Sequence, residues 1–198
     1  NDSVAENTYR TNVTFTSDGF FAANGSGTPQ IYLNKSADDF VAWAFDAGAD
    51  QTATGFGCVN YVGSGAIRPV TDIGFSPDLI WIKERTGAAN HRLFDSVRGP
   101  GINLISNSTS TEGTDNNTQI SFINDGFTLG SNSQVNNNGD DFVAWCWDAG
   151  DSAPASNNDG SVASTVKAST ANGFSIVTHD NGSGTRTVGH GLNSAPEL

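Results

Sequence analysis

The chain contains one stretch of sequence twice. Residues 38–48 read DDFVAWAFDAG and residues 140–150 read DDFVAWCWDAG, so nine of eleven positions are identical. The match extends upstream, where residues 11–20 correspond to residues 118–127. A spacing of about 100 residues is too long for a solenoid, whose repeats span roughly 20 to 50 residues. The sequence therefore predicts an array in which the repeating unit is a domain or most of one.

A second, looser repeat fixes the phase of this array. Residues 55–59 (GFGCV) are echoed by residues 173–177 (GFSIV), and residues 74–79 are echoed by residues 191–198. The first and last units are therefore expected to be partial. The predicted parts are residues 1–54, the closing part of a first unit; 55–150, one complete unit; 151–172, a linker or extra strand; and 173–198, the start of a third unit.

Composition favours a packed fold with many turns and disfavours two classes of partner. Only 15% of the residues are charged, against about 25% in a typical globular domain. The net charge is −12, whereas binding to a nucleic acid backbone or to an anionic membrane needs clustered Lys and Arg. No apolar run approaches the ~20 residues of a membrane span. We expect neither a nucleic acid partner nor membrane insertion.

Short β-branched and aromatic runs, separated by clusters of Asn, Gly, Ser and Asp, predict an all-β fold. We expect an antiparallel β-sandwich, because several of these short strands are apolar enough to be covered by a second layer. The expected strands are residues 79–83, 91–95, 102–105, 119–122, 126–129 and 142–147, with an extra strand over 162–168.

Residues 142–147 are predicted to form a central strand. A helix is the competing interpretation, but six apolar residues bounded by Asp and Gly suit a strand better than a helix of about ten residues or more. With a period of two, Phe142, Ala144 and Cys146 lie on one face and the odd-numbered residues lie on the other. Because both faces are apolar, we expect this strand to be covered on both sides.

The two cysteines, Cys58 and Cys146, are too few for a disulfide scaffold. In the repeats their positions are taken by Ile176 and Ala44, which are apolar or small. We expect two unpaired, buried thiols that pack like small apolar side chains. The alternative is a single bridge between them.

The densest polar cluster in the sequence comprises His91, Asp95 and Arg98. One interpretation is a contact to a sugar or a carboxylate. The favoured one is a solvent-facing ion pair between Asp95 and Arg98, which contributes little free energy. Tyr32 and Tyr61 are further candidates, as aromatic platforms on which a glycan could stack.

Catalytic and metal-binding patterns are weak in this sequence. None of the three histidines has the spacing of a metal-binding pair. The adjacent carboxylates of Asp140 and Asp141 would point to opposite faces of a strand, so they do not form an acid–base couple. Residues 136–141 and 180–184 are rich in oxygen ligands but lack the order of a calcium loop. We expect no catalytic residue and no cofactor, and calcium has no motif to support it.

Several motifs follow one another in a fixed order within residues 11–198. They are GFSPDLIWIK at 74–83, LFDSVRG at 93–99, DGFTLG at 125–130, FVAWCWDAG at 142–150, GSV at 160–162, ANGFSIV at 171–177 and VGHGL at 188–192. In this order they resemble a repeated module of tailed bacteriophages, especially marine ones, found in large virion structural or tail-fibre-like proteins. The resemblance implies a jelly-roll sandwich of the concanavalin A-like kind and carries no catalytic motif onto this sequence.

These observations favour a non-enzymatic structural protein, located on a virion or outside the cell, that assembles with copies of itself or with neighbouring virion subunits. Partial units would expose apolar strands and sheet edges that a neighbouring copy could cover by strand addition. One alternative is a lectin-like module that binds a cell-surface glycan. A remoter one is a glycan-cleaving enzyme, which would need two carboxylates about 5 to 10 Å apart in a cleft.

Overall fold

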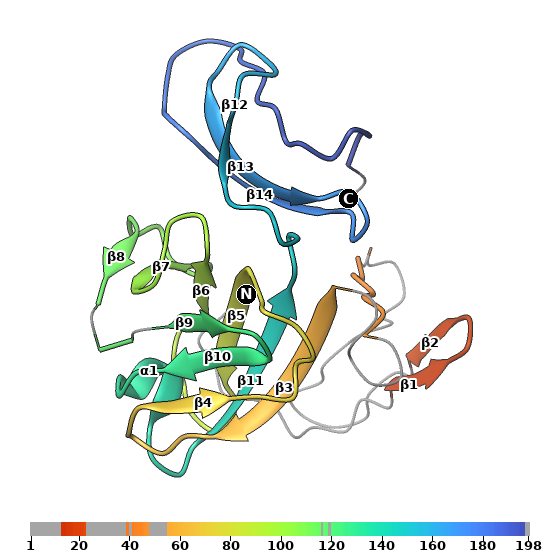
Figure 1. The fold of residues 1–198 in the computed structure, drawn as a ribbon. Helices are drawn as coiled ribbons and strands as arrows, with labels where there is room; N and C mark the ends of the chain where they lie inside the picture. Colours follow the sequence, from red (N-terminus) through yellow and green to blue (C-terminus); the bar gives the residue numbers. More distant parts are fainter. Residues whose placement is uncertain are drawn as a thin grey trace. The chain divides into compact units, whose positions relative to one another are not determined.

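The computed structural model describes residues 13–22, 39, 41–47, 55–115, 117–118 and 120–196. Within these residues the protein consists of antiparallel strands and one short helix (Figure 1). The chain divides into a larger unit, residues 1–5 with 46–198, and a smaller unit, residues 6–45. The elements are β1 Val13–Thr16, β2 Gly19–Ala22, β3 Phe56–Val62, β4 Arg68–Val70, β5 Leu79–Glu84, β6 Arg92–Asp95, β7 Ile102–Ile105, β8 Gly113–Thr114, β9 Ser121–Ile123, β10 Gly126–Leu129, α1 Ser133–Asn136, β11 Asp141–Trp147, β12 Ala155–Asn157, β13 Ser164–Ser169 and β14 Phe174–His179.

The larger unit is organised by a six-stranded sheet with the strand order β3-β11-β5-β6-β7-β8. β11 lies in the interior of this sheet, where Trp145 is opposite Cys58 of β3 on one side and opposite Trp81 of β5 on the other. The even-numbered residues of β11 are buried in the main core, and Trp145 and Trp147 are half-buried on the opposite face. The predicted central strand is therefore confirmed, with the predicted faces.

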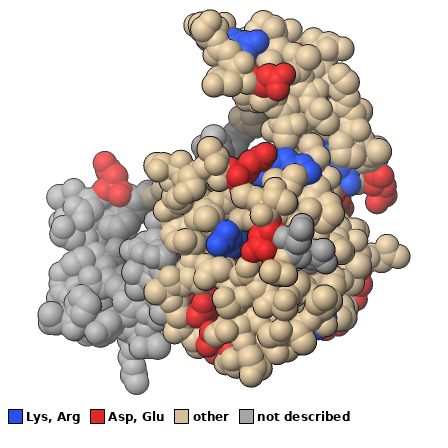
Figure 2. All heavy atoms as spheres, turned by 90° about the vertical axis from the view of Figure 1, so that its left-hand side faces the viewer, with Lys and Arg blue, Asp and Glu red and all other residues tan. Residues whose placement is uncertain are grey.

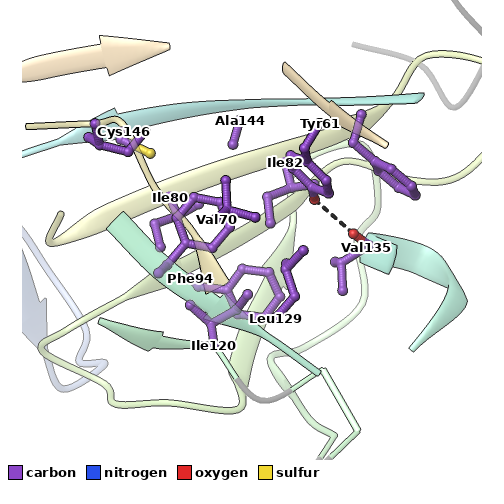
Figure 3. Packing of buried hydrophobic residues seen from close by; sticks show 13 residues of the cluster. Tyr61, Val70, Ile80, Ile82, Phe94, Ile120, Leu129, Val135, Ala144 and Cys146 are labelled. Carbon is purple, nitrogen blue, oxygen red and sulfur yellow. Dashed lines mark hydrogen bonds between the residues drawn. The ribbon is translucent and has the colours of Figure 1, made fainter. Parts of the chain in front are cut away.

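A three-stranded sheet, β4-β10-β9, packs on one face of the six-stranded sheet and closes the core. Phe127 and Leu129 of β10 and Val70 of β4 join Ile80 and Phe94 in a single cluster (Figure 3). Each such side chain contributes about 1.5–3 kcal/mol when it is fully buried. The all-β prediction is confirmed as a sandwich-like packing of antiparallel sheets.

Two buried polar side chains, Tyr61 and Asn136, donate hydrogen bonds that hold α1 and the neighbouring loops against this core. The ring of Tyr61 stacks on Phe142 at 5.2 Å between centroids, and its hydroxyl donates to the carbonyl of Val135 at 2.7 Å (Figure 3). Asn136, at the end of α1, is fully buried, and its amide nitrogen donates to the carbonyls of Ala66 and Gly130, both at 2.8 Å. Such pairing offsets the penalty of burying polar atoms.

Asp78, just before β5, connects several segments of the larger unit. Its buried carboxylate accepts hydrogen bonds from Ser96 Oγ at 2.6 Å, from the backbone N–H of Ala149 at 2.9 Å and from Lys167 Nζ at 2.6 Å. Lys167 belongs to β13, in the separate sheet β12-β13-β14. This ion pair therefore links the second half of the larger unit to its six-stranded sheet. Phe174 of β14 adds an aromatic contact at 6.1 Å to Trp147.

The smaller unit contains the hairpin β1–β2, in which Phe15 lies opposite Phe20 and Thr16 lies opposite Gly19. Residues 41–45, whose sequence repeats residues 143–147 of β11, belong to no strand.

Most expected strands occur, with shifted ends. β7 and β10 have the expected bounds, β11 begins one residue earlier, and the extra strand expected over 162–168 is β13. The strand expected over 119–122 is β9, which begins at Ser121. Helix α1 was not expected from the sequence; the side chain of Asn132 caps it by accepting from the backbone N–H of Gln134. The division of the chain into repeat units stays a prediction.

No disulfide joins the two cysteines. Cys146 lies in the core opposite Gly57, whereas Cys58 lies opposite Trp145 on the other face of the sheet. Because the thiols point to opposite faces, a bridge between them would require the strands to twist out of register. Cys146 is buried as expected and Cys58 is only half-buried.

Asp78 and Lys167 should be energetically coupled. Asp78→Asn and Lys167→Met each leave one member of the pair without its partner, which costs about 3–5 kcal/mol when a pair is buried. Because the double variant removes both charges, it should lose less than the sum, with a coupling of about 1–3 kcal/mol. Urea unfolding of wild type, the two single variants and the double variant measures this coupling.

Glu112→Gln is the control, because Glu112 is a 56% exposed partner of Arg98. It should change the free energy of unfolding by less than about 1 kcal/mol. Additive losses from Asp78 and Lys167 would contradict the role of this pair.

The thiol of Cys146 should resist alkylation in the folded protein. Burial raises the pKa of both thiols, and at Cys146 the neighbouring Cys58 adds to the rise. At about pH 8 little thiolate is then present to react. Peptide mass spectrometry after iodoacetamide treatment should find Cys146 modified only in denaturant and Cys58 modified slowly without it. Modification of Cys146 at equal rates with and without denaturant would show that the core does not close over this strand.

Candidate functional site

The most unusual surface in the described chain is the hairpin β1–β2. Phe15 is 85% exposed and Phe20 is 48% exposed, and the two lie opposite one another on one face. Val13, on the same face by strand alternation, is also exposed. Single exposed apolar residues are ordinary, but a cluster of aromatic side chains on one face marks an interaction surface.

A second hairpin of the same chain shows how such a surface is covered. In β9–β10, Phe122 lies opposite Phe127 and Ile123 lies opposite Gly126, the same register as in β1–β2. Phe20 corresponds in sequence to Phe127, which is fully buried. The two hairpins therefore have the same strand pairing but different surroundings.

The neighbour that makes this difference is β4. β4 pairs with β10, and a Cβ at Gly126 would meet the carbonyl oxygen of Val70 at 2.1 Å. At Gly19, the equivalent glycine of the first hairpin, an added Cβ would meet nothing within 4 Å. Among the described residues, β1 and β2 form a sheet of two strands. In the part of the chain that the structure describes, no strand takes beside the first hairpin the position that β4 takes beside the second.

The segment 41–45 shows the same contrast with β11. Val41 is 73% exposed and Trp43 is 71% exposed, whereas their equivalents Val143 and Trp145 are buried and half-buried. The difference follows from pairing, because β11 has β3 and β5 as neighbours. The hairpin β1–β2 and the segment 41–45 are together called the exposed repeat.

β14 resembles β3 in conformation as well as in sequence. Gly173, before β14, and Gly55, before β3, both have a φ of 65°, which favours glycine. Further along, Gly184 has a φ of 82° where the equivalent Gly65 has 70°. β14 lies at the edge of the sheet β12-β13-β14. It is a β3-like strand whose outer edge carries no partner strand in the described part of the chain.

The candidate ligand contacts from the sequence do not converge. The Asp95–Arg98 ion pair is formed at 2.6 Å, but the side chains are only 6% and 13% exposed, so it is not the solvent-facing pair that we expected. His91 precedes β6 and Asp95 ends it, which separates them by about 13 Å at ~3.3 Å per residue. Nδ1 of His91 accepts a hydrogen bond from Trp81 Nε1 at 2.8 Å.

Of the two candidate tyrosines, only Tyr61 lies among the described residues. Tyr61 is buried in the core, where one face of its ring stacks on Phe142. A buried ring offers no surface for stacking a glycan, so Tyr61 acts in packing. Tyr32 lies outside the described residues.

A shallow hollow lies where β11 leads into the second half of the larger unit. It is lined by Phe75, Asn124, Asp148, Asp151 and Lys167, among others. Asp148 accepts hydrogen bonds from the backbone N–H of Gly150 at 2.6 Å and from Asn172 Nδ2 at 3.1 Å, and Lys167 is bound to Asp78. The charged groups of Asp148 and Lys167 in this hollow are therefore already bound to other parts of the fold.

The titratable side chains form no metal site among the described residues, and one carboxylate pair stands out. Over the described ranges, no three His, Cys, Asp or Glu side chains lie so that they could hold a metal ion. The structure does place Glu84 near Asp140: burial raises the pKa of Glu84, the charge of Asp140 adds to the rise, and Lys83 opposes it. Sequence reasoning missed this pair because its members are 56 positions apart and no motif joins them.

Replacing Glu84 with Gln should stabilise the protein at neutral pH. Since the pKa of Glu84 is raised on folding, ionising it costs more in the folded state than in the unfolded state. The variant should therefore have the higher unfolding midpoint at about pH 7, and the advantage should shrink as the pH falls below about 4, where the carboxyl becomes neutral in both states. Thermal unfolding of wild type, Glu84→Gln and the exposed control Glu112→Gln measures the difference. A Glu84→Gln advantage that grows on acidification would contradict the assignment.

Charged residues on the face drawn in Figure 2 are scattered, with Lys and Arg interspersed among Asp and Glu and no continuous basic patch among the residues drawn in colour. In the described chain, no helix has the length and apolarity to span a bilayer.

Comparison with known proteins identifies a family. The model of a domain of unknown function, DUF7483, matches residues 51–198, and the chain therefore belongs to this family. No curated protein and no solved structure matched the chain.

Proposed function

We propose that this member of the DUF7483 family is a non-enzymatic structural protein of a virion or another extracellular assembly, built from tandem jelly-roll units that associate with copies of themselves. The observation that carries the proposal is the exposed repeat, in which Phe15, Phe20 and Trp43 lie in solvent although their sequence equivalents are buried or half-buried. Full burial of one such side chain is worth about 1.5–3 kcal/mol. An aromatic surface of this size favours association.

Tandem organisation is supported by paired features of local structure. The hairpins β1–β2 and β9–β10 share one register. Gly55 and Gly173 share one backbone conformation, and Gly74 and Gly191 have φ values of 84° and 73°. Since positive φ is set by the turn each glycine must make, these matches support equivalent turns in successive units.

A structural role is also supported by how the polar groups near the core are used. Asp78 and Asn136 are buried, and each makes hydrogen bonds that join separate segments, to Ala149 and to Ala66. The placement on a virion or outside the cell rests on the motif resemblance to phage modules and on the low content of charged residues.

Removing the aromatic face of the first hairpin should weaken self-association. Sedimentation velocity of the wild-type chain over a range of concentrations should show oligomers. Phe15→Ser combined with Phe20→Ser should raise the dissociation constant by about two to four orders of magnitude, from the lost burial of two rings.

Ile67→Ser is the matched control, because Ile67 is 70% exposed in the larger unit and belongs to neither part of the exposed repeat. It should leave association unchanged. A wild-type chain that is monomeric at every concentration would contradict the proposed function, as would equal effects of the two sets of substitutions.

A further inference from the structure

We propose that Asn181, in the loop of residues 180–187 that follows β14, is a site of spontaneous deamidation. The backbone nitrogen of Gly182 attacks the side-chain amide of Asn181, and Arg186 assists the attack. The reaction takes place within one loop of one chain, so it is independent of the self-association proposed above.

Asn–Gly is a favourable sequence for this reaction, because glycine has no Cβ to hinder the approach of its nitrogen. The sequence contains this pair four times, beginning at Asn24, Asn138, Asn172 and Asn181. Asn24 lies outside the described residues. The other three pairs occur in different local structures, so the fold distinguishes between them.

At Asn181 the two reacting groups already lie side by side. The backbone N–H of Gly182 donates to Oδ1 of Asn181 at 2.8 Å, which holds the nitrogen beside the side-chain carbonyl group that it attacks. Neither residue belongs to a helix or a strand, and Asn181 is exposed. Because reacting groups held in proximity lose less entropy on the way to the transition state, this pair is poised for attack.

Arg186 brings a positive charge to the same place. A Cβ added to Gly182 would meet Nη1 of Arg186 at 1.8 Å, so the guanidinium lies against the backbone of this glycine. The attack develops negative charge on the nitrogen of Gly182 and then on Oδ1 of Asn181, and a neighbouring cation stabilises both. Since Arg186 is exposed, solvent and salt screen this effect and keep it modest.

At Asn138 the attacking nitrogen is engaged elsewhere. The backbone N–H of Gly139 donates to the carbonyl of Gly63 at 2.9 Å, just beyond the paired ends of β3 and β11. This bond must break before the nitrogen of Gly139 can turn towards the side chain of Asn138. The fold therefore protects Asn138.

At Asn172 it is the side chain that is engaged. Its Nδ2 donates to the carbonyl of Asp148 at 3.2 Å and to the carboxylate of the same residue at 3.1 Å. These bonds hold the amide of Asn172 against the segment after β11. The carboxylate of Asp148 also disfavours negative charge on the nearby reacting atoms. The fold therefore protects Asn172 as well.

The reaction balances with water as its co-reactant. A bond forms between the nitrogen of Gly182 and Cγ of Asn181, and the bond between Cγ and Nδ2 breaks. Ammonia leaves with the proton that the nitrogen of Gly182 gives up, and a cyclic imide remains. Water then opens the imide at either carbonyl carbon, which gives an aspartate or an isoaspartate.

Both products change the connection that follows β14. Each adds a negative charge in the loop that carries Arg186, and the isoaspartate also lengthens the main chain. The altered loop must still reach Thr187, whose carbonyl accepts a hydrogen bond from the backbone N–H of Ser161 at 2.9 Å.

Peptide mapping of the folded chain compares the three sites in one sample. The wild-type chain is incubated in mildly alkaline water labelled with heavy oxygen, so that each deamidation leaves a label in the product. Mass spectrometry should find Asn181 converted at least about tenfold faster than Asn138 or Asn172, because each of those sites must first lose hydrogen bonds. In denaturant the three rates should converge.

Arg186→Gln tests the assisting charge. It should slow conversion of Asn181 about two- to fivefold, the size expected of an exposed charge, and Arg186→Lys should keep most of the rate. Asn138 and Asn172 serve as internal controls, whose rates should not change in either variant. High salt should reduce the difference between wild type and Arg186→Gln.

Equal rates at the three sites of the folded chain, or a faster rate at Asn138 or Asn172, would overturn the assignment of Asn181. A rate at Asn181 that is the same in wild type and Arg186→Gln would overturn the role of Arg186.

Discussion

A strand that is apolar on both faces is stable only between neighbouring strands and under cover on both sides, and this constraint organises the protein. β11 satisfies it: β3 and β5 flank it, Phe142 and Cys146 lie in the core, and Trp145 packs against Trp81 at 5.7 Å between ring centroids. The same sequence at 41–45 does not satisfy it in the described chain, and its side chains are exposed. One sequence thus occurs in two environments, and among the described residues only the copy in β11 lies between neighbouring strands.

Two buried polar residues, Asp78 and Tyr61, also hold parts of the fold together, because each makes a hydrogen bond to a distant segment. Asp78 joins the start of β5 to the segment after β11 and to β13, and Tyr61 joins β3 to α1. The ion pair of Asp95 and Arg98 is buried at the end of β6. That pair is local, whereas the buried ion pair of Asp78 and Lys167 joins the segment before β5 to the sheet β12-β13-β14.

Features of the fold that follow from local sequence patterns could be predicted, whereas contacts between residues far apart in the sequence could not. Strand positions follow from local patterns, so β7, β10 and β11 were predicted closely, and the alternation of Phe142 to Trp147 predicted both faces of β11. Partners across the fold leave no local mark: Lys167 lies 89 positions from Asp78, and Trp81 finds His91 only because β5 and β6 pair. The burial of Tyr61 was missed because its strand is half polar, and the candidate contacts His91 and Asp95 lie at opposite ends of one strand. For the exposed repeat, the sequence showed the duplication, and only the structure showed that the side chains of the first copy are exposed.

Amide hydrogen exchange on the wild-type chain, dilute and then concentrated enough to associate, tests the central claim most directly. If the exposed repeat is covered by another copy, residues 13–22 and 41–45 should gain protection together on association, while the core strands β5 and β11 stay protected in both conditions. Protection that appears elsewhere, for example only at the edge strand β8, or association without any change in residues 41–45, would contradict the account.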